Sequence, residues 1–365
     1  MSLLEVTDLR VSFPTADGVV QAVRGVSFSV ERGKTLGIVG ESGSGKTVLT
    51  QSLLGLTPGG QISGQAMFDG VNLVGLGSRA MQRIRGKEIA VIFQDPLTSL
   101  HPLYKVGWQI AEMIRAHDKS VSKSQAINRA TELLGRVGIP RPRERVDDYP
   151  HQFSGGMRQR AMIAMAISLS PKLVIADEPT TALDATVQAQ ILDLLLRLQQ
   201  ESDTALLMIT HDLGVVADIA DNVMVMYAGR AAEKASKRDA FYQPHHPYTK
   251  GLLESIPHSS AARDRLRPIT GQPPSLITLP AGCAFHPRCA YVMDRCLTEQ
   301  PNLTPVGGDA GEHRSACFLP AAAVGLDSEA EELRKHAVEL GRSGQAVKVA
   351  EAIAAAPESE GSVIA

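Results

Sequence analysis

Eight consecutive residues near the start of the chain have the composition of a phosphate-binding loop. The segment reads GESGSGKT, matches the pattern G-x-x-x-x-G-K-[ST], and consists of Gly40, Glu41, Ser42, Gly43, Ser44, Gly45, Lys46 and Thr47. Glycines let successive backbone N–H groups converge on phosphate oxygens, and the positive end of a following helix points at them. Lys46 adds a charge for the outer phosphates, and Thr47 offers a hydroxyl to Mg²⁺. A chance Gly/Ser loop is the alternative, but an apolar run before the segment and a helical pattern after it favour phosphate binding.

A second motif ends in two carboxylates. Residues 172–178 read KLVIADE, a short apolar run that delivers Asp177 and Glu178 to its carboxyl end. Ligands of open α/β folds bind at that edge of the sheet, so Asp177 would hold Mg²⁺ through water and Glu178 would act as general base on the attacking water. An acidic pair at a helix start is also stabilised by the helix dipole alone. The upstream phosphate loop favours the catalytic interpretation.

These motifs need a parallel sheet to bring them together, and the sequence predicts one. Strands covered on both faces are apolar throughout, as in a parallel α/β sheet. Runs of that kind occupy residues 34–40, 90–94, 172–178 and 205–211. Residues 3–12 and 22–31 instead alternate apolar and polar side chains, which predicts two antiparallel strands.

Other parts of the chain have different patterns. Residues 108–116 and 126–138 have helical spacing, which indicates a mostly helical insert between Gln94 and Phe153. After about Tyr242 the chain is rich in proline and irregular up to Pro320, and its length of 365 residues fits one large domain with an appendage. The last segment is rich in Ala and Glu, with one amphipathic helix predicted over residues 329–341 and a disordered end.

Composition excludes several classes of protein. Hydrophobic residues make up 44% of the chain and charged residues 21%, which is typical of a globular protein with a sizeable core. The net charge of −2 gives no support to a nucleic-acid partner, which usually needs a basic excess. No segment has the length of a membrane span or the pattern of a secretory signal, so we expect a cytosolic chain that reaches a membrane only through partners.

All four cysteines lie in the irregular segment. Cys283, Cys289, Cys296 and Cys317 are spaced C-x5-C-x6-C-x20-C. Such clustering in a cytosolic chain favours a metal site over disulfides. Four thiolates can hold zinc or a four-iron–four-sulfur cluster, although the spacing lacks the C-x2-C pairs of common zinc ribbons. Zinc, an iron–sulfur cluster and no metal all remain open at this point.

A further motif points to one family. Residues 153–157 read FSGGM and precede a helical segment. The motif resembles the LSGGQ signature of ABC ATPases, with Phe153 and Met157 as departures and Ser154, Gly155 and Gly156 intact. The resemblance implies an α/β fold: a RecA-like parallel sheet core, an antiparallel β subdomain and a helical subdomain. In ABC ATPases the serine and glycines of the signature cap the γ-phosphate that the opposite subunit's P-loop holds.

Four other positions match the family. Gln94 resembles the Q-loop glutamine that touches Mg²⁺ and the attacking water, and His211 resembles the switch histidine at the γ-phosphate. Asp184, after Ala182 and Leu183, resembles the D-loop residue at the dimer interface. Phe13 falls where the family stacks an aromatic ring on adenine. Without the family, His211 would be interpreted as a capping or surface residue and Phe13 as a core residue.

The resemblance extends to one branch of importers. DPLTSLHP after Gln94, YPHQFSGGMRQR, and QPHHPYTKGLL from Gln243 to Leu253 look like the peptide and nickel branch. It implies an ABC ATP-binding domain over residues 1–242, with its helical subdomain at about 97–165, and a C-terminal extension over 243–320 followed by a tail over 321–365. The cysteines look like the ligands of a 4Fe-4S cluster in that extension. Without the family, the last motif would be a Pro-rich surface linker.

The same resemblance implies function and partners. We expect an ATPase that works with Mg²⁺ and powers uptake of di- or oligopeptides, peripheral on the cytoplasmic face of the bacterial inner membrane. Its partners would be a second, paralogous ATPase subunit in a heterodimer, two transmembrane permeases and an extracytoplasmic binding protein. Importers of nickel, glycosides or other small solutes are the nearest alternative. A soluble, non-transport ABC ATPase fits less well, since such proteins usually carry two ATPase cassettes or a long coiled coil. An exporter ATPase also fits less well, since it is not expected to carry this extension.

Overall fold

Two β-sheets form the centre of the molecule. The computed structural model describes residues 2–181, 183–255, 269–307 and 312–320. Within these ranges the larger sheet has the strand order β11-β12-β10-β9-β3-β8-β7-β6. Its strands are β3 (Thr35–Val39), β6 (Ile89–Ile92), β7 (Leu173–Asp177), β8 (Ala205–Thr210), β9 (Asn222–Tyr227), β10 (Arg230–Ser236), β11 (Thr304–Pro305) and β12 (Arg314–Ser315).

The predicted parallel core is confirmed. Strands β6, β7, β8, β3 and β9 pair in parallel, and every residue of β3, β7 and β8 is buried. Burial on both faces explains why these segments are apolar throughout. The carboxyl ends of β3, β7 and β8 therefore meet at one edge of the sheet, which is where the predicted chemical residues follow each strand.

The predicted antiparallel strands are also confirmed. The smaller sheet has the order β2-β1-β4-β5. Its strands are β1 (Ser2–Thr15), β2 (Gly18–Glu31), β4 (Gln61–Phe68) and β5 (Val71–Asn72). A hydrophobic core that includes Leu9, Phe28, Leu53 and Ile209 joins this sheet to the larger one.

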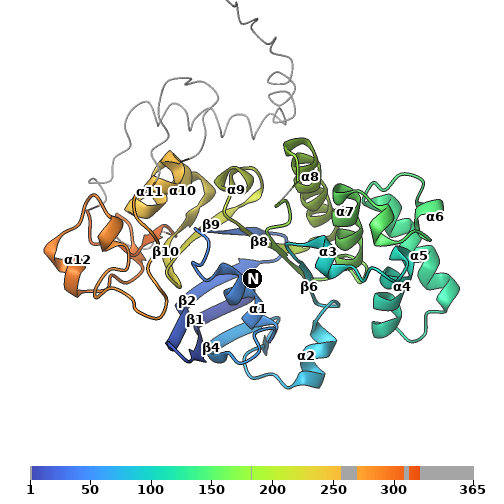
Figure 1. The fold of residues 1–365 in the computed structure, drawn as a ribbon, viewed down its shortest axis with the longest axis horizontal. Coiled ribbons are helices and arrows are strands. Elements are labelled where there is room, and N and C mark those ends of the chain that lie inside the picture. The colour runs from blue at the N-terminus through green and yellow to red at the C-terminus, as the bar shows by residue number, and fades with distance from the viewer. Residues whose placement is uncertain (1, 182, 256–268, 308–311, 321–365) are drawn as a thin grey trace, which may run out of the picture.

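The helices surround the larger sheet and form a separate group at one end (Figure 1). They are α1 (Lys46–Leu53), α2 (Ser78–Ile84), α3 (Pro96–Ser99), α4 (Val106–His117), α5 (Lys123–Arg136), α6 (Pro142–Arg145), α7 (Gly155–Ala166), α8 (Ala185–Ser202), α9 (Leu213–Ile219), α10 (Lys237–Tyr242), α11 (Pro247–Glu254) and α12 (Asp294–Thr298). Helices α4 and α5 confirm the predicted helical insert. Within the described ranges, every helix is too short or too polar to span a lipid bilayer.

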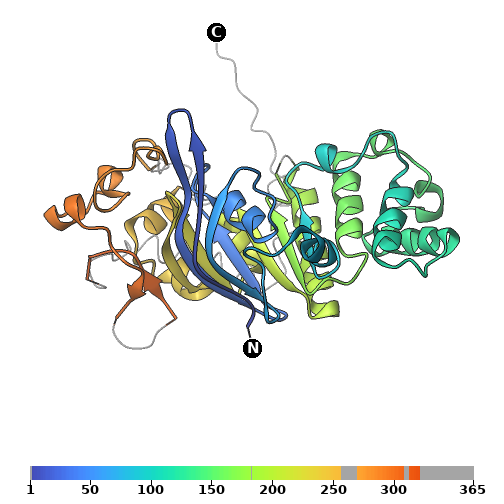
Figure 2. The same cartoon turned by 90° about the horizontal axis from the view of Figure 1, so that it is seen from below.

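The C-terminal extension lies at the opposite end of the molecule from the helical insert (Figures 1 and 2). Its short strand β12 pairs antiparallel with β10, with Glu233 opposite Ser315. A third hydrophobic core combines Val216 and Tyr227 of the sheet region with Tyr248 and Phe285 of the extension. The segment predicted to be irregular therefore adds strands to the main sheet and shares a core with it. The helix predicted over residues 329–341 lies outside the described residues.

Candidate functional site: a nucleotide cleft at the carboxyl edge of the sheet

The predicted phosphate loop connects β3 to α1. Gly40, Gly43 and Gly45 all have positive φ angles, of 155°, 78° and 100°. At Gly45 a Cβ atom would collide with the backbone carbonyl of Ala22, so only glycine fits there. Gly45 is also the N-cap of α1 and supplies no side-chain hydrogen bond. The N–H groups of the first turn are therefore available to an anion, whose charge the helix dipole favours.

Lys46 lies at the bottom of this loop. Its side chain is 5% exposed, and its Nζ donates to the carbonyl oxygens of Gly40 at 2.7 Å and Glu41 at 3.0 Å. Burial lowers the pKa of Lys46, while the negative charges of Glu178, Asp177 and Glu41 act in the opposite direction. Nζ also lies 3.5 Å from the Ser44 hydroxyl, and a buried ammonium that is satisfied only by neutral loop oxygens strongly attracts phosphate oxygens.

Thr47 and Asp177 face each other across the strand ends. The Thr47 hydroxyl Oγ1 donates to Oδ1 of Asp177 at 3.2 Å, and Asp177 is 6% exposed. Burial raises the pKa of the Asp177 carboxyl, with the neighbouring Glu178 charge adding to the effect. The Thr47 hydroxyl and the buried Asp177 carboxylate fit Mg²⁺, because Mg²⁺ prefers oxygen ligands. The ion would also balance the negative charge of the carboxylate.

Three predicted catalytic residues meet at Glu178. Its φ of 47° is left-handed, and its N–H donates to the Ile209 carbonyl of β8 at 2.8 Å. One carboxylate oxygen, Oε2, accepts from Nε2 of Gln94 at 2.9 Å and from the hydroxyl of Thr181 at 3.0 Å. The other, Oε1, lies 3.2 Å from Nδ1 of His211. A strained backbone that aims a carboxylate at polar partners is typical of a functional position. Sequence reasoning missed Thr181, which belongs to no motif that it used.

The site opens into a cleft of about 910 Å³. The phosphate loop, Gln94, Glu178 and His211 line it, together with Phe13 beside Val20 and Ala22 of the β1–β2 hairpin. The extension adds Ser255 and three apolar residues, Leu252, Ile269 and Leu276, to the lining. The N–H of Gln21 donates to the Leu276 carbonyl at 3.0 Å, which fastens the extension to the hairpin. Nothing in the sequence signalled that the extension reaches the cleft, because its irregular segment has no periodicity to follow.

The signature residues do not line this cleft. Ser154, Gly155 and Gly156 begin α7, where the hydroxyl of Ser154 accepts from the N–H of Met157 at 3.3 Å. A Cβ at Gly156 would lie 2.9 Å from the Cγ1 of Val187, so the close packing of α7 on α8 requires glycine there. Ser154 and Gly155 are exposed and face solvent.

Asp184 is likewise separate from the cleft. Its carboxylate caps α8 by accepting from the N–H of Val187 at 2.9 Å. The side chain is exposed, and Ala182 before it lies outside the described residues. The structure thus brings the P-loop, Gln94, Asp177, Glu178 and His211 together within one chain, and leaves the signature and Asp184 apart from them.

In the described residues the four cysteines are not gathered into the metal site that the sequence predicts. Cys283, Cys289, Cys296 and Cys317 are all free, and the N–H of Cys283 donates to the Cys296 carbonyl at 2.9 Å. Burial raises the pKa of the Cys283 and Cys289 thiols and raises that of Cys317 to about 11. Across residues 2–181, 183–255, 269–307 and 312–320, no three His, Cys, Asp or Glu side chains gather closely enough to hold a metal ion. Spacing alone could not show how irregular backbone would direct the thiols.

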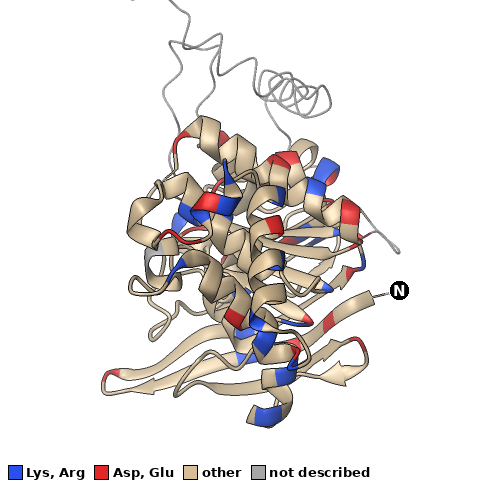
Figure 3. Cartoon of the chain, turned by 90° about the vertical axis from the view of Figure 1, so that its right-hand side faces the viewer, with Lys and Arg blue, Asp and Glu red and all other residues tan. Residues whose placement is uncertain are grey.

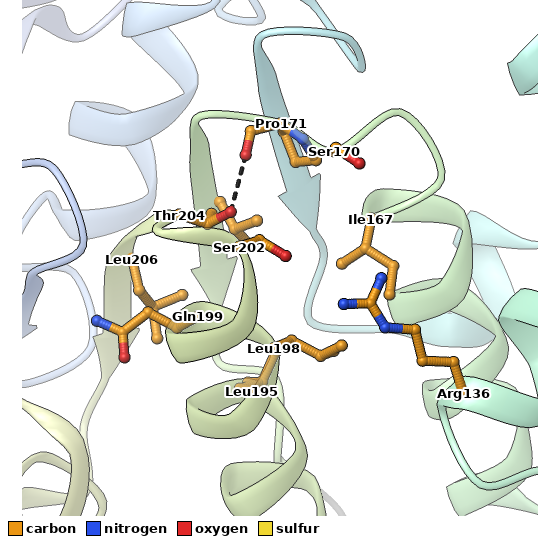
Figure 4. Close-up of a pocket in the computed structure, with 11 residues that line it drawn as sticks. Arg136, Ile167, Ser170, Pro171, Leu195, Leu198, Gln199, Ser202, Thr204 and Leu206 are labelled. Atoms are coloured by element: carbon orange, nitrogen blue, oxygen red, sulfur yellow. Dashed lines mark hydrogen bonds between the residues drawn. The ribbon is translucent and has the colours of Figure 1, made fainter.

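A second cavity lies at the opposite edge of the sheet (Figure 4). It is lined by Ser170 and Pro171 before β7, by Thr204 before β8, and by Leu195 and Arg136. The Thr204 hydroxyl donates to the Pro171 carbonyl at 2.9 Å. Its volume is about 30 Å³, room for a water molecule and not for a nucleotide. The cleft at the carboxyl edge is thus the better candidate for a substrate site.

Comparison with known proteins assigns the class. The ABC transporter family model matches residues 23–181, and the model for the oligopeptide/dipeptide transporter C-terminal region matches residues 232–296. Among solved structures, a dimeric bacterial ABC transporter cassette has a TM-score of 0.59 at 24% identity, covering 64% of this chain and 99% of the cassette. The protein cbiO1 from Clostridium perfringens, part of the ABC transporter complex cbiONQ, has a TM-score of 0.56 at 28% identity, covering 66% of this chain and 90% of cbiO1. The fold and the site define an ABC-type P-loop ATPase.

Full-length relatives narrow the class to a family. The oligopeptide transport ATP-binding protein of Bacillus subtilis is 53% identical over 308 residues, covering 83% of this chain and 86% of the relative. The corresponding protein of Salmonella typhimurium is 50% identical over 319 residues, covering 87% and 94%. The dipeptide transport ATP-binding protein of Bacillus subtilis is 50% identical over 320 residues, with the same coverage. The chain belongs to this family of oligopeptide and dipeptide transport ATP-binding proteins.

Proposed function

We propose that the chain hydrolyses ATP to power an ABC importer that takes up di- or oligopeptides. The observation that carries the hydrolytic part is the meeting of Gln94, Thr181 and His211 on the Glu178 carboxylate, at the mouth of the P-loop cleft. The names of the relatives, oligopeptide and dipeptide transport proteins, support the peptide substrate. The ATPase subunit does not contact the transported substrate, so the proposed substrate class rests on the relatives.

Each residue of the site has a proposed role. The P-loop amides and Lys46 bind the outer phosphates, and Phe13 stacks on the adenine base. Mg²⁺ would be held by Thr47, Asp177 and Gln94, and would supply neutralisation of the developing phosphate charge. Glu178 accepts a proton from the attacking water, and His211 orients the γ-phosphate.

The signature serves a second subunit in this proposal. Ser154, Gly155 and Gly156 are exposed or half-buried and absent from the chain's own cleft. They would meet the γ-phosphate on the P-loop of a second, paralogous ATPase subunit, with Asp184 at the same interface. Closing the heterodimer around ATP and reopening it after hydrolysis is a two-state change that differential nucleotide contacts drive.

The helical insert is the proposed contact with two transmembrane permeases. Leu103, Tyr104 and Trp108 at the start of α4 are large apolar residues with 77%, 46% and 41% exposure. The ring of Tyr104 stacks on Trp108 at 4.4 Å between centroids. Basic and acidic residues are interspersed along the ribbon on this side of the molecule (Figure 3). An exposed aromatic group in such surroundings is typical of a protein contact.

That contact would place the chain peripherally on the cytoplasmic face of the bacterial inner membrane. An extracytoplasmic binding protein would deliver substrate to the complex. The proposed division of the chain is an ATP-binding domain over residues 1–242, with the helical subdomain at about 97–165, then the extension over 243–320 and the tail over 321–365.

Purification of the full complex tests this function. The tagged chain should copurify with two polytopic membrane proteins and a second ATPase. Reconstituted with a binding protein in vesicles, the complex should accumulate labelled di- or oligopeptides only when ATP is on the side of the ATPases. Uptake of nickel or glycosides without peptide uptake would overturn the peptide assignment, and a chain that never copurifies with membrane proteins would overturn the importer.

We also propose that the four cysteines hold a 4Fe-4S cluster, on the strength of their thiol chemistry and family resemblance. The N–H of Cys283 donates to the Cys296 carbonyl at 2.9 Å, so two of the four cysteines lie side by side in the extension. The irregular backbone would have to rearrange to close the site, and metal binding would supply folding energy to the extension. Anaerobically purified protein should be brown, with visible absorbance and about four irons per chain by metal analysis. Colourless protein with bound zinc, or with no metal, would contradict the cluster.

A further inference from the structure

Arg288 of the extension contacts the phosphate loop directly. Its Nη1 lies 2.6 Å from Oε2 of Glu41, and its Nη2 lies 2.9 Å from Oε1 of the same carboxylate. The two residues are 247 positions apart in the chain. The Arg288 side chain is 4% exposed and that of Glu41 is 27% exposed. A bidentate pair of this kind, largely withdrawn from water, fixes orientation as well as distance.

The extension holds Arg288 rigidly in this pose. Nε donates to the Thr270 carbonyl at 2.9 Å, Nη2 to the Ile269 carbonyl at 3.4 Å, and Nη1 to the hydroxyl of Tyr227 at 3.3 Å. Together with the two bonds to Glu41, these contacts give every N–H of the guanidinium an acceptor. An arginine whose donors are all engaged cannot rotate away without breaking several bonds at once.

Glu41 is held at its backbone as well. Its N–H donates to the hydroxyl of Tyr248 at 2.8 Å, and its carbonyl accepts from Nζ of Lys46 at 3.0 Å. Tyr248 is fully buried, with its ring 4.6 Å from that of Tyr227 between centroids. Three residues therefore hold Glu41 of the P-loop. Arg288 and Tyr248 belong to the extension, and the third is the phosphate-binding Lys46.

We propose that Arg288 and Tyr248 are positioning residues for nucleotide binding, and that they act through Glu41. By holding Glu41, they keep the loop in the conformation that presents its amides and Lys46 to the phosphates before nucleotide arrives. Preorganisation of this kind lowers the cost of binding. The extension is then part of the nucleotide site and does not only add structure beside it. This inference rests on the proposed nucleotide site.

The test is Mg²⁺-ADP binding by the full chain, with steady-state ATP hydrolysis by the complex as a second readout. Arg288→Gln should weaken ADP affinity by about tenfold and raise KM more than it lowers kcat, because the hydrogen bonds lost are charge-assisted. Arg288→Lys keeps the charge but cannot bind both oxygens of the Glu41 carboxylate, so the loss of ADP affinity should be smaller. Tyr248→Phe removes one hydroxyl from the core and should weaken affinity by about threefold.

Arg295→Gln is the matched control. Arg295 also belongs to the extension and also precedes a cysteine, but its bridge to Glu299 is on the surface, with the two side chains 59% and 55% exposed. This substitution should leave ADP affinity within about twofold of the unmodified chain. A thermal melt of each variant separates loss of affinity from loss of folding. Should Arg288→Gln fail to fold, Arg288→Lys and Tyr248→Phe carry the test.

A double-mutant cycle decides whether Arg288 acts through Glu41. In a Glu41→Gln background, Arg288→Gln should add less than about twofold to the loss, because the partner is already gone. Full additivity, equal losses in the Arg295→Gln control, or normal affinity in folded Arg288→Lys and Tyr248→Phe would each overturn the inference. If the unmodified chain binds no nucleotide, the proposed function fails as well. If the unmodified chain binds nucleotide normally and only the variants behave otherwise than expected, the positioning inference alone fails.

Discussion

Two helix starts in this chain are proposed to meet phosphate, and they are built differently. The helix α1 begins after Gly45, which is in a left-handed conformation and makes no side-chain cap. The helix α7 begins after Ser154, whose hydroxyl already accepts from a first-turn N–H group. The first turn of α1 is thus open to an anion within its own chain, whereas that of α7 is partly satisfied by its own serine.

This difference between the two helix starts predicts that changes at one affect nucleotide binding and changes at the other affect turnover. The cleft at α1 contains Lys46, Glu178 and His211, and in the proposed function these residues bind nucleotide and activate water within one chain. The start of α7 is exposed, and none of the described residues there lines that cleft. Under the proposed function, changes at α1 affect nucleotide affinity or chemistry in the single chain, while changes at α7 affect only the closed pair.

The largest expected effect is at Glu178. Glu178→Gln keeps the hydrogen bonds of a polar side chain but removes the base, so kcat should fall by about 10²–10⁴-fold while ADP affinity is retained. Steady-state hydrolysis and ADP titration measure the two quantities. The control is Glu201→Gln, since Glu201 is 45% exposed and pairs with Arg136 far from the cleft. Turnover at the unmodified rate in Glu178→Gln would remove the base assignment.

Lys46 tests the open helix start itself. Lys46→Ala should weaken Mg²⁺-ADP affinity of the single chain by about 10²-fold, because several charge-assisted bonds to phosphate are lost. The matched control is Lys34→Ala. Lys34 precedes β3 at the opposite edge of the sheet and pairs with Asp221 on the surface, with the two side chains 53% and 38% exposed. Equal affinity losses in both variants would show that the effect is not specific to the loop.

Much of this site could be predicted from local sequence. The strands that end at Val39, Asp177 and Thr210 are buried on both faces, and burial leaves an apolar run that is easily recognised. The residues that follow each strand meet because parallel strands end at one edge. The glycines also helped to predict the phosphate loop. At Gly45, the positive φ and the nearby carbonyl of Ala22 exclude every residue with a side chain.

Contacts between distant segments could not be predicted. Arg288 reaches Glu41 across 247 positions, and no period or motif links them. The strands β11 and β12 are two residues long each, too short to show alternation. The cysteines illustrate the same limit, because their spacing indicated a metal site that the described residues do not assemble. Tertiary packing, and not local preference, decides the geometry of such irregular segments.

Ser154 tests the capped helix start. Ser154→Ala should lower turnover of the complex by about tenfold, while ADP affinity of the single chain stays unchanged, because the hydroxyl meets phosphate only on a partner. Loss of the cap should also cost about 1 kcal/mol of stability in a denaturant titration.

Ser122→Ala is the matched control for that cap. Ser122 caps α5 by accepting from the N–H of Gln125 at 3.2 Å, in the helical insert and away from the signature. It should show a similar loss of stability with normal turnover. If Ser154→Ala instead weakens ADP binding by the isolated chain, the two helix starts are not independent and the comparison fails.

The smallest expected effect is at Met157, where the signature departs from its usual glutamine. Ser154 holds the backbone N–H of Met157, and the half-buried side chain packs against the helical core. Met157→Gln should therefore change turnover of the complex within about twofold, with a small loss of stability from the polar amide in an apolar contact. Hydrolysis assays on the complex and a thermal melt measure both. A large gain or loss of turnover would mean that the side chain itself reaches the partner's nucleotide, so that α7 contributes more to the closed site than its capped backbone.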